Sequence, residues 1–341
     1  MTQKTKLIFV VGASRSGTTM LSRILGNNTQ ITALKELHYF GDLFDPGNTA
    51  KSLSEEEIAR SIATLLARQE KEVWHGKPTE KEINLASKIS REFTSNNTNG
   101  FDLFERVATE FAKKEHTIYT VEHTPRNIYY ASQILQNLPN AFIIFVARDP
   151  RAVLASQKKR WRRKWLGGSN TPWKEVIRVW VNYHPITMSK LWNKATNTAL
   201  KLKNEPRFKL IRFEDIVETP EIIVKNICNF LDVDYEANML SIPQIGSSNR
   251  DNLTSNKGIA KDVVNQWNNS LNIGELVISE HLCGQSMQDL RYTTAYMNKK
   301  MSLSLIFQII TFPIHILGVL FTNPRRAYIQ LRATVKNKTK S

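Results

Sequence analysis

The sequence predicts an α/β domain built on a P-loop-like, mainly parallel sheet with helices on both faces, followed by a hydrophobic C-terminal extension. Short apolar runs alternate with longer helical stretches, as expected for strand–helix–strand units. A glycine-rich turn follows the first run, and the 341 residues with 41% hydrophobic content are enough to bury one substantial core. The strand-like runs are 7–11, 118–121, 142–146 and 209–212.

The first run leads into residues 12–19, Gly-Ala-Ser-Arg-Ser-Gly-Thr-Thr, and then into an amphipathic segment at 20–25. Glycines allow a tight turn whose N–H groups face an anion, and the positive end of a helix dipole strengthens that attraction. The glycine spacing copies the loop of nucleotide triphosphatases, but Thr18 stands where that motif needs lysine, and Arg15 supplies the charge instead. An ATPase is therefore disfavoured, and a glycine turn without a ligand is the other alternative.

The pattern Gly-x-x-Arg-Ser-Gly-Thr-Thr resembles the 5′-phosphosulfate loop of sulfotransferases that use 3′-phosphoadenosine 5′-phosphosulfate (PAPS). A second segment, 142–156, resembles the 3′-phosphate site of that family, with Arg148 at a strand end and Ser156 eight residues later. Arginine grips a phosphate through two hydrogen bonds, although an ion pair with Asp149 is the ordinary alternative for Arg148.

A third segment, 209–217, resembles the family's strand, Tyr-Glu-Asp-Leu and helix pattern, but Phe213 replaces the tyrosine. Phenylalanine can stack on a base but cannot donate a hydrogen bond, so we leave Phe213 out of the predicted site. The resemblance covers roughly residues 6–292 and is closest to sulfotransferases acting on carbohydrates and on protein tyrosines.

The resemblance implies that PAPS is a co-substrate. Because Arg15 and the loop amides can neutralise the charge that develops in the transfer, we expect no metal. Arg160 and Lys257 match phosphate-side positions of the tyrosylprotein type, although the basic run 158–164 is also compatible with a solvated face or with binding an acidic acceptor or membrane. The residues expected to bind PAPS are Arg15, Ser16, Gly17, Thr18, Thr19, Arg148, Ser156, Arg160 and Lys257.

Transfer to a hydroxyl requires a base, and Glu36 is our candidate. It lies twenty-one residues after Arg15, where the tyrosylprotein type carries its catalytic glutamate; a surface glutamate paired with Lys35 is the alternative. His123 precedes a Thr-Pro pair at a position where relatives carry lysine. A protonated His123 would donate to the leaving group, and a purely structural histidine is the alternative.

Composition and net charge indicate which classes of binding partner to expect. The formal net charge of +16 favours anionic partners such as PAPS, acidic acceptors or anionic lipid, and since no nucleic-acid motif accompanies it, we expect no nucleic acid. Two lone cysteines, Cys228 and Cys283, lie in apolar helical contexts and are expected to be reduced core thiols in a cytosolic setting. The polar region 45–111, with a helix-capping pattern at Ser54, is expected to shape the acceptor pocket or its lid.

Features near the two ends of the sequence predict where in the cell the protein lies. The first strand begins by Leu7, which leaves no room for a signal peptide or N-terminal anchor, so we expect a cytoplasmic catalytic domain over 1–295. In the tail, 296–341, the apolar stretch 301–321 lies between basic pairs at 299–300 and 325–326. Because Pro313 and His315 interrupt it, we expect a broken helix lying in a membrane interface; a true span and burial against protein are the alternatives.

The predicted function is sulfuryl transfer from PAPS to a hydroxyl of a carbohydrate, glycolipid or other small acceptor, and a lipid-linked acceptor would suit membrane attachment. One alternative is a P-loop kinase that uses ATP. Another is a noncatalytic, membrane-associated protein that binds nucleotide or acidic lipid.

Overall fold

The computed structural model describes residues 4–47, 52–71, 77–92, 98–161, 172–244, 257–260, 264 and 266–322. The chain divides into two compact units. The first, which we call the sheet unit, comprises Met1–Arg148, Ala195–Pro243 and Lys257–Ile259; the second, the helical unit, comprises Asp149–Lys194, Gln244–Asn256 and Ala260–Ser341. The predicted boundary between residues 295 and 296 stays a prediction.

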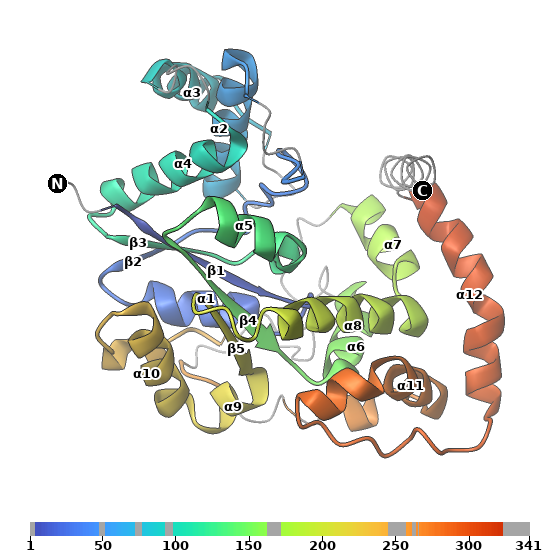
Figure 1. The fold of residues 1–341 in the computed structure, drawn as a ribbon. Coiled ribbons are helices and arrows are strands. Elements are labelled where there is room, and N and C mark those ends of the chain that lie inside the picture. The colour runs from blue at the N-terminus through green and yellow to red at the C-terminus, as the bar shows by residue number, and fades with distance from the viewer. Residues whose placement is uncertain are drawn as a thin grey trace. The chain divides into compact units, whose positions relative to one another are not determined.

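The sheet unit contains five parallel strands in the order β2-β3-β1-β4-β5 (Figure 1). The predicted parallel sheet is thereby confirmed, and each predicted strand matches an observed one to within a residue or so at its ends. The short strand β2 was not predicted, because three residues are too few to show an alternating pattern. The strands are β1 (Lys6–Gly12), β2 (Ile31–Ala33), β3 (Tyr119–Glu122), β4 (Ala141–Ala147) and β5 (Phe208–Arg212).

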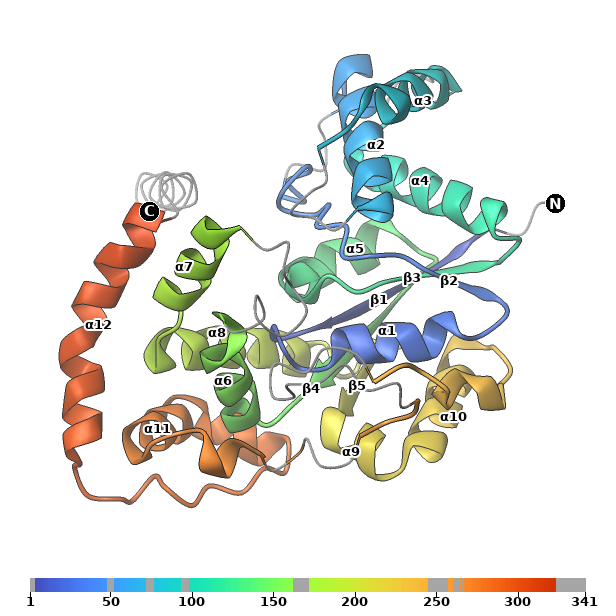
Figure 2. The same cartoon turned by 180° about the vertical axis from the view of Figure 1, so that it is seen from behind.

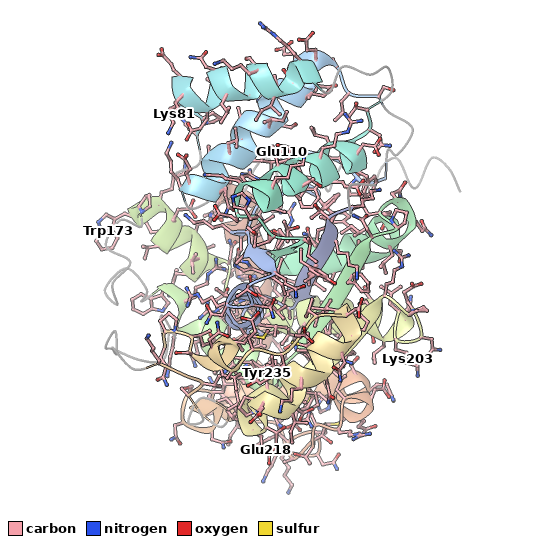
Figure 3. The ribbon with its side chains drawn as sticks, turned by 90° about the vertical axis from the view of Figure 1, so that its left-hand side faces the viewer. Lys81, Glu110, Trp173, Lys203, Glu218 and Tyr235 are labelled. Atoms are coloured by element: carbon pink, nitrogen blue, oxygen red, sulfur yellow. The ribbon has the colours of Figure 1, made fainter. Side chains whose placement is uncertain are left out.

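Helices cover both faces of this sheet: α1 lies on one face, and α4 and α5 lie on the other (Figures 1 and 2). The capping box predicted at Ser54 is present, since Ser54 and Glu57 bond to each other's backbone N–H groups at the start of α2. Charged side chains such as Lys81, Glu110 and Glu218 point outward (Figure 3). The helices are α1 (Thr18–Gly26), α2 (Glu55–Glu70), α3 (Glu80–Glu92), α4 (Gly100–Lys114), the 3₁₀ helix η2 (Pro125–Tyr130), α5 (Ala131–Asn137), α9 (Phe213–Glu218), α10 (Pro220–Leu231) and η4 (Ala237–Leu240).

An aromatic cluster fixes the segment that follows β2. The Phe40 ring is wholly buried, with its centroid 6.0 Å from that of Phe9 and 5.1 Å from that of Phe104. The Tyr39 hydroxyl donates to the Gly100 carbonyl at 2.8 Å, so α4 and this segment are tied together. The segment after β2 is therefore held on the sheet by a packed apolar core.

The helical unit is built around a buried ion network. The Arg151 guanidinium bonds to Asp149 at 2.7 Å and to Glu280 at 2.8 Å, and it lies 4.1 Å from the centre of a Trp267 ring. Pairing of this kind is what allows buried charges to be tolerated. The elements of the unit are α6 (Pro150–Lys158), α7 (Trp173–Val181), α8 (Pro185–Lys201) as far as Lys194, η6 (Gln266–Asn269), α11 (Ile273–Asp289) and α12 (Leu303–Thr322).

Both cysteines are free and buried, as predicted. Burial raises the pKa of the Cys228 thiol to about 11 and that of the Cys283 thiol to about 12. The two thiols are therefore protonated near neutral pH and poorly nucleophilic.

The C-terminal helix α12 runs unbroken through Pro313, which corrects the predicted broken helix. Proline removes one backbone donor and crowds the carbonyl four residues earlier, which distorts a helix locally without ending it. By length and composition α12 is able to cross a membrane, and none of its residues is buried in the unit. The basic pair at 325–326 lies outside the described residues.

Candidate functional site

The carboxyl ends of the five parallel strands bring most of the predicted site residues to one edge of the sheet. Ligands of open α/β sheets bind at this edge. The strand order puts Glu36 and His123 on one side of the loop after β1, and Arg148 on the other. In order across the edge lie Glu36 after β2, His123 after β3, the loop 12–17 after β1, Arg148 after β4 and Phe213 after β5.

The loop after β1 has the geometry of an anion cradle. Gly17 has φ = 99° and Arg15 has φ = 79°, so two left-handed residues turn the chain sharply before α1. Gly12 admits no side chain, because an added Cβ would lie 2.7 Å from the Val146 carbonyl oxygen. Helix α1 begins at Thr18 with no side-chain cap and no acidic residue in its first turn, which leaves its N-terminal N–H groups and dipole for an anion.

The Ser16 hydroxyl supports a ligand in this loop. Ser16 is completely buried, and its Oγ has no hydrogen-bond partner among the described residues. A buried hydroxyl without a partner is costly, so a bound phosphate or sulfate oxygen would satisfy it. Among the other predicted loop residues, Thr18 is buried and Thr19 is exposed.

The ring of Phe213 supports both the loop and Arg148. A Cβ on Gly17 would lie 2.4 Å from this ring, and the Arg148 guanidinium lies 4.3 Å from the ring centre. One Arg148 NH group also donates to the Arg15 carbonyl at 3.0 Å. The sequence analysis left Phe213 out of the site because it weighed only contact with the adenine base. The position of Phe213 directly after a predicted strand could have indicated that it lies at the site.

Glu36 is partly exposed, at 38% of its side chain, and its Oε2 lies 3.2 Å from Nε2 of His38. The Lys35 ammonium, its expected alternative partner, donates to the Glu70 carbonyl at 2.7 Å. Arg68 holds the backbone next to Glu36, because its guanidinium donates to the carbonyls of Leu37 and His38. The carboxylate is therefore presented from a fixed stretch of backbone while remaining open to solvent.

A buried carboxyl group, that of Glu122, holds the backbone of the segment that contains Glu36. Glu122 accepts hydrogen bonds from the Leu37 N–H at 3.0 Å and from Nδ2 of Asn127 at 2.9 Å. Thr124, which also donates to Glu122, accepts the His38 N–H at 3.1 Å. Burial raises the pKa of the Glu122 carboxyl, and the hydrogen bonds from Thr124 oppose that rise. Sequence reasoning missed this anchor, although Glu122 directly precedes the motif it examined.

His123 is fixed in one tautomer. Its Nδ1 lies 3.0 Å from the Leu34 carbonyl oxygen, which can only accept, so Nδ1 carries the proton. In the neutral ring Nε2 then bears the lone pair. His123 accepts a proton through Nε2 when neutral and donates through Nε2 only when the ring is protonated.

The remaining predicted residues are Lys257, Ser156 and Arg160. Lys257 is exposed in the sheet unit and forms an isolated bridge with Pro243; residues 255–256 before it lie outside the described residues. Ser156 is buried on α6 and Arg160 is half-buried after it, both in the helical unit. Their part in binding a phosphate stays a prediction.

The basic run 158–164 is partly structural. The Lys158 ammonium donates to Glu275 at 2.8 Å and to the Ser270 carbonyl at 3.1 Å, within the helical unit. Residues 162–164 lie outside the described residues. In the ranges that the structure describes, no group of three or more His, Cys, Asp or Glu side chains is suited to a metal ion.

Comparisons with known proteins give both a family and a fold. A family model described as the sulfotransferase family matches residues 8–237. The sulfotransferase domain of the olefin synthase from Synechococcus PCC 7002 aligns with a TM-score of 0.54 and 19% identity, over 86% of this chain and 98% of that one. The sulfotransferase domain from the curacin biosynthetic pathway aligns with a TM-score of 0.50 and 16% identity, over 85% and 99%. These structures share the predicted α/β fold, and no curated protein sequence matches the chain.

The packing of Phe213 on Gly17 predicts a coupled effect on stability. Gly17→Ala should lower the free energy of unfolding by about 1–3 kcal/mol, because alanine is strained at positive φ and its methyl group meets the ring. In a Phe213→Ala background the same change should lower the free energy of unfolding by a smaller amount, since only the backbone strain remains. A double-mutant cycle by chemical denaturation measures the difference, and equal costs in both backgrounds would refute the contact.

Proposed function

Because the chain belongs to the sulfotransferase family, as its motifs predict, we propose that it transfers a sulfuryl group from PAPS to a hydroxyl of a carbohydrate, glycolipid or other small acceptor. The observation that carries this proposal is the strand order, which sets the anion loop between Glu36 and His123 on one side and Arg148 on the other. In-line displacement needs the nucleophile and the leaving group on opposite sides of the sulfur, and this order puts Glu36 and Arg148 on opposite sides of the loop. His123 follows the strand next to the loop, between Glu36 and the loop.

PAPS would be held by the loop and by Arg148. The loop N–H groups, the Ser16 hydroxyl and the start of α1 suit the 5′-phosphosulfate, because they are donors that face an anion. Arg148, stacked on Phe213, suits the 3′-phosphate, which distinguishes PAPS from ATP. The other residues in our proposed site are Arg15, Gly17, Thr18 and Thr19 on the loop, with Ser156, Arg160 and Lys257 as further phosphate-side groups.

In the proposed reaction the acceptor hydroxyl loses its proton to the Glu36 carboxylate as its oxygen bonds to sulfur. The bond from sulfur to the bridging oxygen of the 5′-phosphate breaks, and 3′,5′-phosphoadenosine (PAP) leaves with that oxygen. Arg15 and the loop amides stabilise the charge that develops on the leaving phosphate. A protonated His123 would add a donor through Nε2, the nitrogen that its bond to Leu34 leaves for this role.

Glu36 is proposed as the base because its carboxylate is reachable while its backbone is fixed. The neighbouring His38 holds Oε2, which orients the carboxyl group. The alternative function, a kinase that uses ATP, lacks the lysine that such a loop needs, since Thr18 takes that position. A noncatalytic role in binding nucleotide or acidic lipid would not need a proton acceptor at Glu36.

The acceptor and the location are also proposals. Helices α2–α4 follow the segment after β2 that contains Glu36, so they are suited to form the acceptor side of the site. The exposed apolar helix α12 supports attachment of a cytoplasmic enzyme to a membrane, which would give it access to a lipid-linked hydroxyl.

Glu36→Gln should reduce sulfate transfer from labelled PAPS by a factor of about 100 or more, because glutamine cannot accept the acceptor's proton. Its affinity for PAP in calorimetry should stay at the wild-type value, since Glu36 lies on the far side of the loop from Arg148. Glu218→Gln, at an exposed glutamate of α9, is the matched control and should leave both unchanged. Loss of PAP binding in Glu36→Gln, or near-normal turnover, would contradict the role of Glu36.

Arg148→Ala should weaken PAP binding about 10–100-fold, because it removes charge-assisted hydrogen bonds to one phosphate. Adenosine 5′-phosphosulfate has no 3′-phosphate, so its affinity should hardly change. Calorimetry with both ligands on both proteins makes the comparison. Equal losses for the two ligands would mean that Arg148 supports the loop through its bond to Arg15 rather than reading the 3′-phosphate.

A further inference from the structure

Helix α12 differs from an ordinary surface helix in which of its side chains are exposed. Its half-buried side mixes small and polar residues, among them Ser304, Gln308, His315 and Gly318, with the apolar Leu305, Phe312 and Val319, whereas every residue on its exposed side is apolar. A surface helix in water keeps polar residues on its solvent side, so the exposed side of α12 is suited to an apolar covering. The large side chains that α12 exposes are Leu303, Phe307, Ile310, Ile314, Leu317 and Phe321.

The start of α12 is joined to α11 within the helical unit. The Gly274 N–H at the beginning of α11 donates to the Ser304 hydroxyl at 3.0 Å. A Cβ on Gly274 would lie 2.5 Å from the Leu305 backbone nitrogen, so the two backbones approach closely.

The rest of α12 is joined to α7, to α8 and to His184 in the turn between them. His184 donates through Nε2 to the Gln308 carbonyl at 3.1 Å, and Nε2 of His315 lies 3.0 Å from the Thr187 hydroxyl. Nearer its end, Gly318 packs on Val181, the last residue of α7. A helix that crossed a bilayer would give up these contacts or carry α7 and α11 with it, so α12 in this arrangement lies along the unit.

Helix α7 exposes a second apolar stripe. Trp173, Ile177 and Trp180 recur at the i, i+4 and i+7 positions of one helix face, and all three are exposed, Ile177 at 55%. Figure 3 shows Trp173 projecting outward from its helix. Tryptophan is enriched where hydrocarbon meets water, because its ring is apolar and its N–H is polar.

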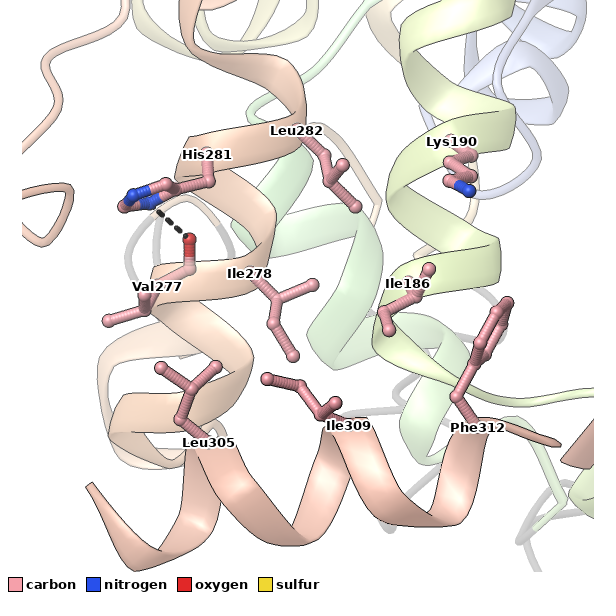
Figure 4. A pocket seen from close by; sticks show the side chains of 9 residues that line it. All are labelled: Ile186, Lys190, Val277, Ile278, His281, Leu282, Leu305, Ile309 and Phe312. Atoms are coloured by element: carbon pink, nitrogen blue, oxygen red, sulfur yellow. Dashed lines mark hydrogen bonds between the residues drawn. The ribbon is translucent and has the colours of Figure 1, made fainter. Parts of the chain in front are cut away.

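The same unit has an apolar groove between α8, α11 and α12 (Figure 4). Its volume is about 420 Å³, and Ile186, Ile278 and Ile309 point toward one another across it. Lys190 stands at one end of the groove. Hydrocarbon with an anionic group near Lys190 suits this lining better than a polar solute does.

Among the described residues of the helical unit, basic side chains outnumber acidic ones at the surface. Asp149, Glu275 and Glu280 are buried and paired with Arg151 or Lys158. Glu175 on α7 is paired with Arg178, and Asp289 is the exposed carboxylate of α11. The lysines Lys174, Lys190, Lys299 and Lys300 are exposed. A second copy of this chain would bring the same positive charge to the face, whereas anionic lipid headgroups complement it.

We propose that α7 and α12 together form a docking face that seats the helical unit in the boundary between headgroups and acyl chains of an anionic bilayer, with α12 parallel to the membrane plane. This inference rests on the membrane attachment offered above as part of the proposed function. The inference adds α7 to α12 as a second membrane contact, and it requires α12 to lie in the membrane plane rather than to span the bilayer.

The test uses the full chain with vesicles of phosphatidylcholine alone and of phosphatidylcholine mixed with phosphatidylserine. Wild type should sediment with the mixed vesicles and detach as salt is raised, because exposed charge pairs are screened. Ile177→Glu should weaken binding about tenfold or more, since it places a charge where a side chain enters hydrocarbon. Ile222→Glu on α10 of the sheet unit, where the isoleucine is 60% exposed, is the matched control and should bind like wild type.

Three outcomes would overturn the proposal. Wild type that binds no vesicle and forms dimers that Ile177→Glu disrupts would show that a second copy covers the face. Normal binding of Ile177→Glu would show that α7 takes no part, and retention of wild type on vesicles after an alkaline wash would show that α12 spans. PAP affinity, measured on each variant, should stay unchanged, so failure of docking is distinguishable from failure of the sulfotransferase site.

Discussion

The packing of the Phe213 ring against Gly17 and beneath Arg148 is the contact on which the phosphate side of the site depends. It joins the ends of β1, β4 and β5, three strands whose following loops would otherwise be free to move apart. Because glycine alone fits both the left-handed backbone and the space above the ring, the loop cannot relax without losing the stack. Donors held in advance by such packing stabilise a developing charge without a reorganisation cost.

A second anchor, the buried Glu122, fixes the other side of the loop. It bonds to the backbone of the segment that carries Glu36 and to Thr124, directly after His123. The two anchors share no residue, so the acceptor side and the cofactor side are built separately on one sheet edge. The strand order alone aligns them, which is why the proposed proton acceptor Glu36, the loop after β1 and the proposed phosphate ligand Arg148 occur in that sequence across the edge.

Much of this site was predictable from local patterns, since the loop 12–19 and the strand end at Arg148 each carry their signal within a few residues. The anchors were not, because Phe213 and Glu122 act through contacts with residues far away in the chain, and no local pattern records those. The same limit explains α12. Its composition predicted a membrane helix, but only the tertiary contacts of Ser304 and His315 reveal that its polar side faces protein.

The central claim is that the sheet edge recognises a nucleotide with a 3′-phosphate, and calorimetric titration of the wild-type protein without added metal tests it most directly. The account predicts tight binding of PAP and little binding of ATP, because Arg148 is proposed to bind a 3′-phosphate and Thr18 takes the place of the loop lysine that binds a γ-phosphate. Preference for ATP over PAP would contradict the account and point to phosphoryl transfer instead.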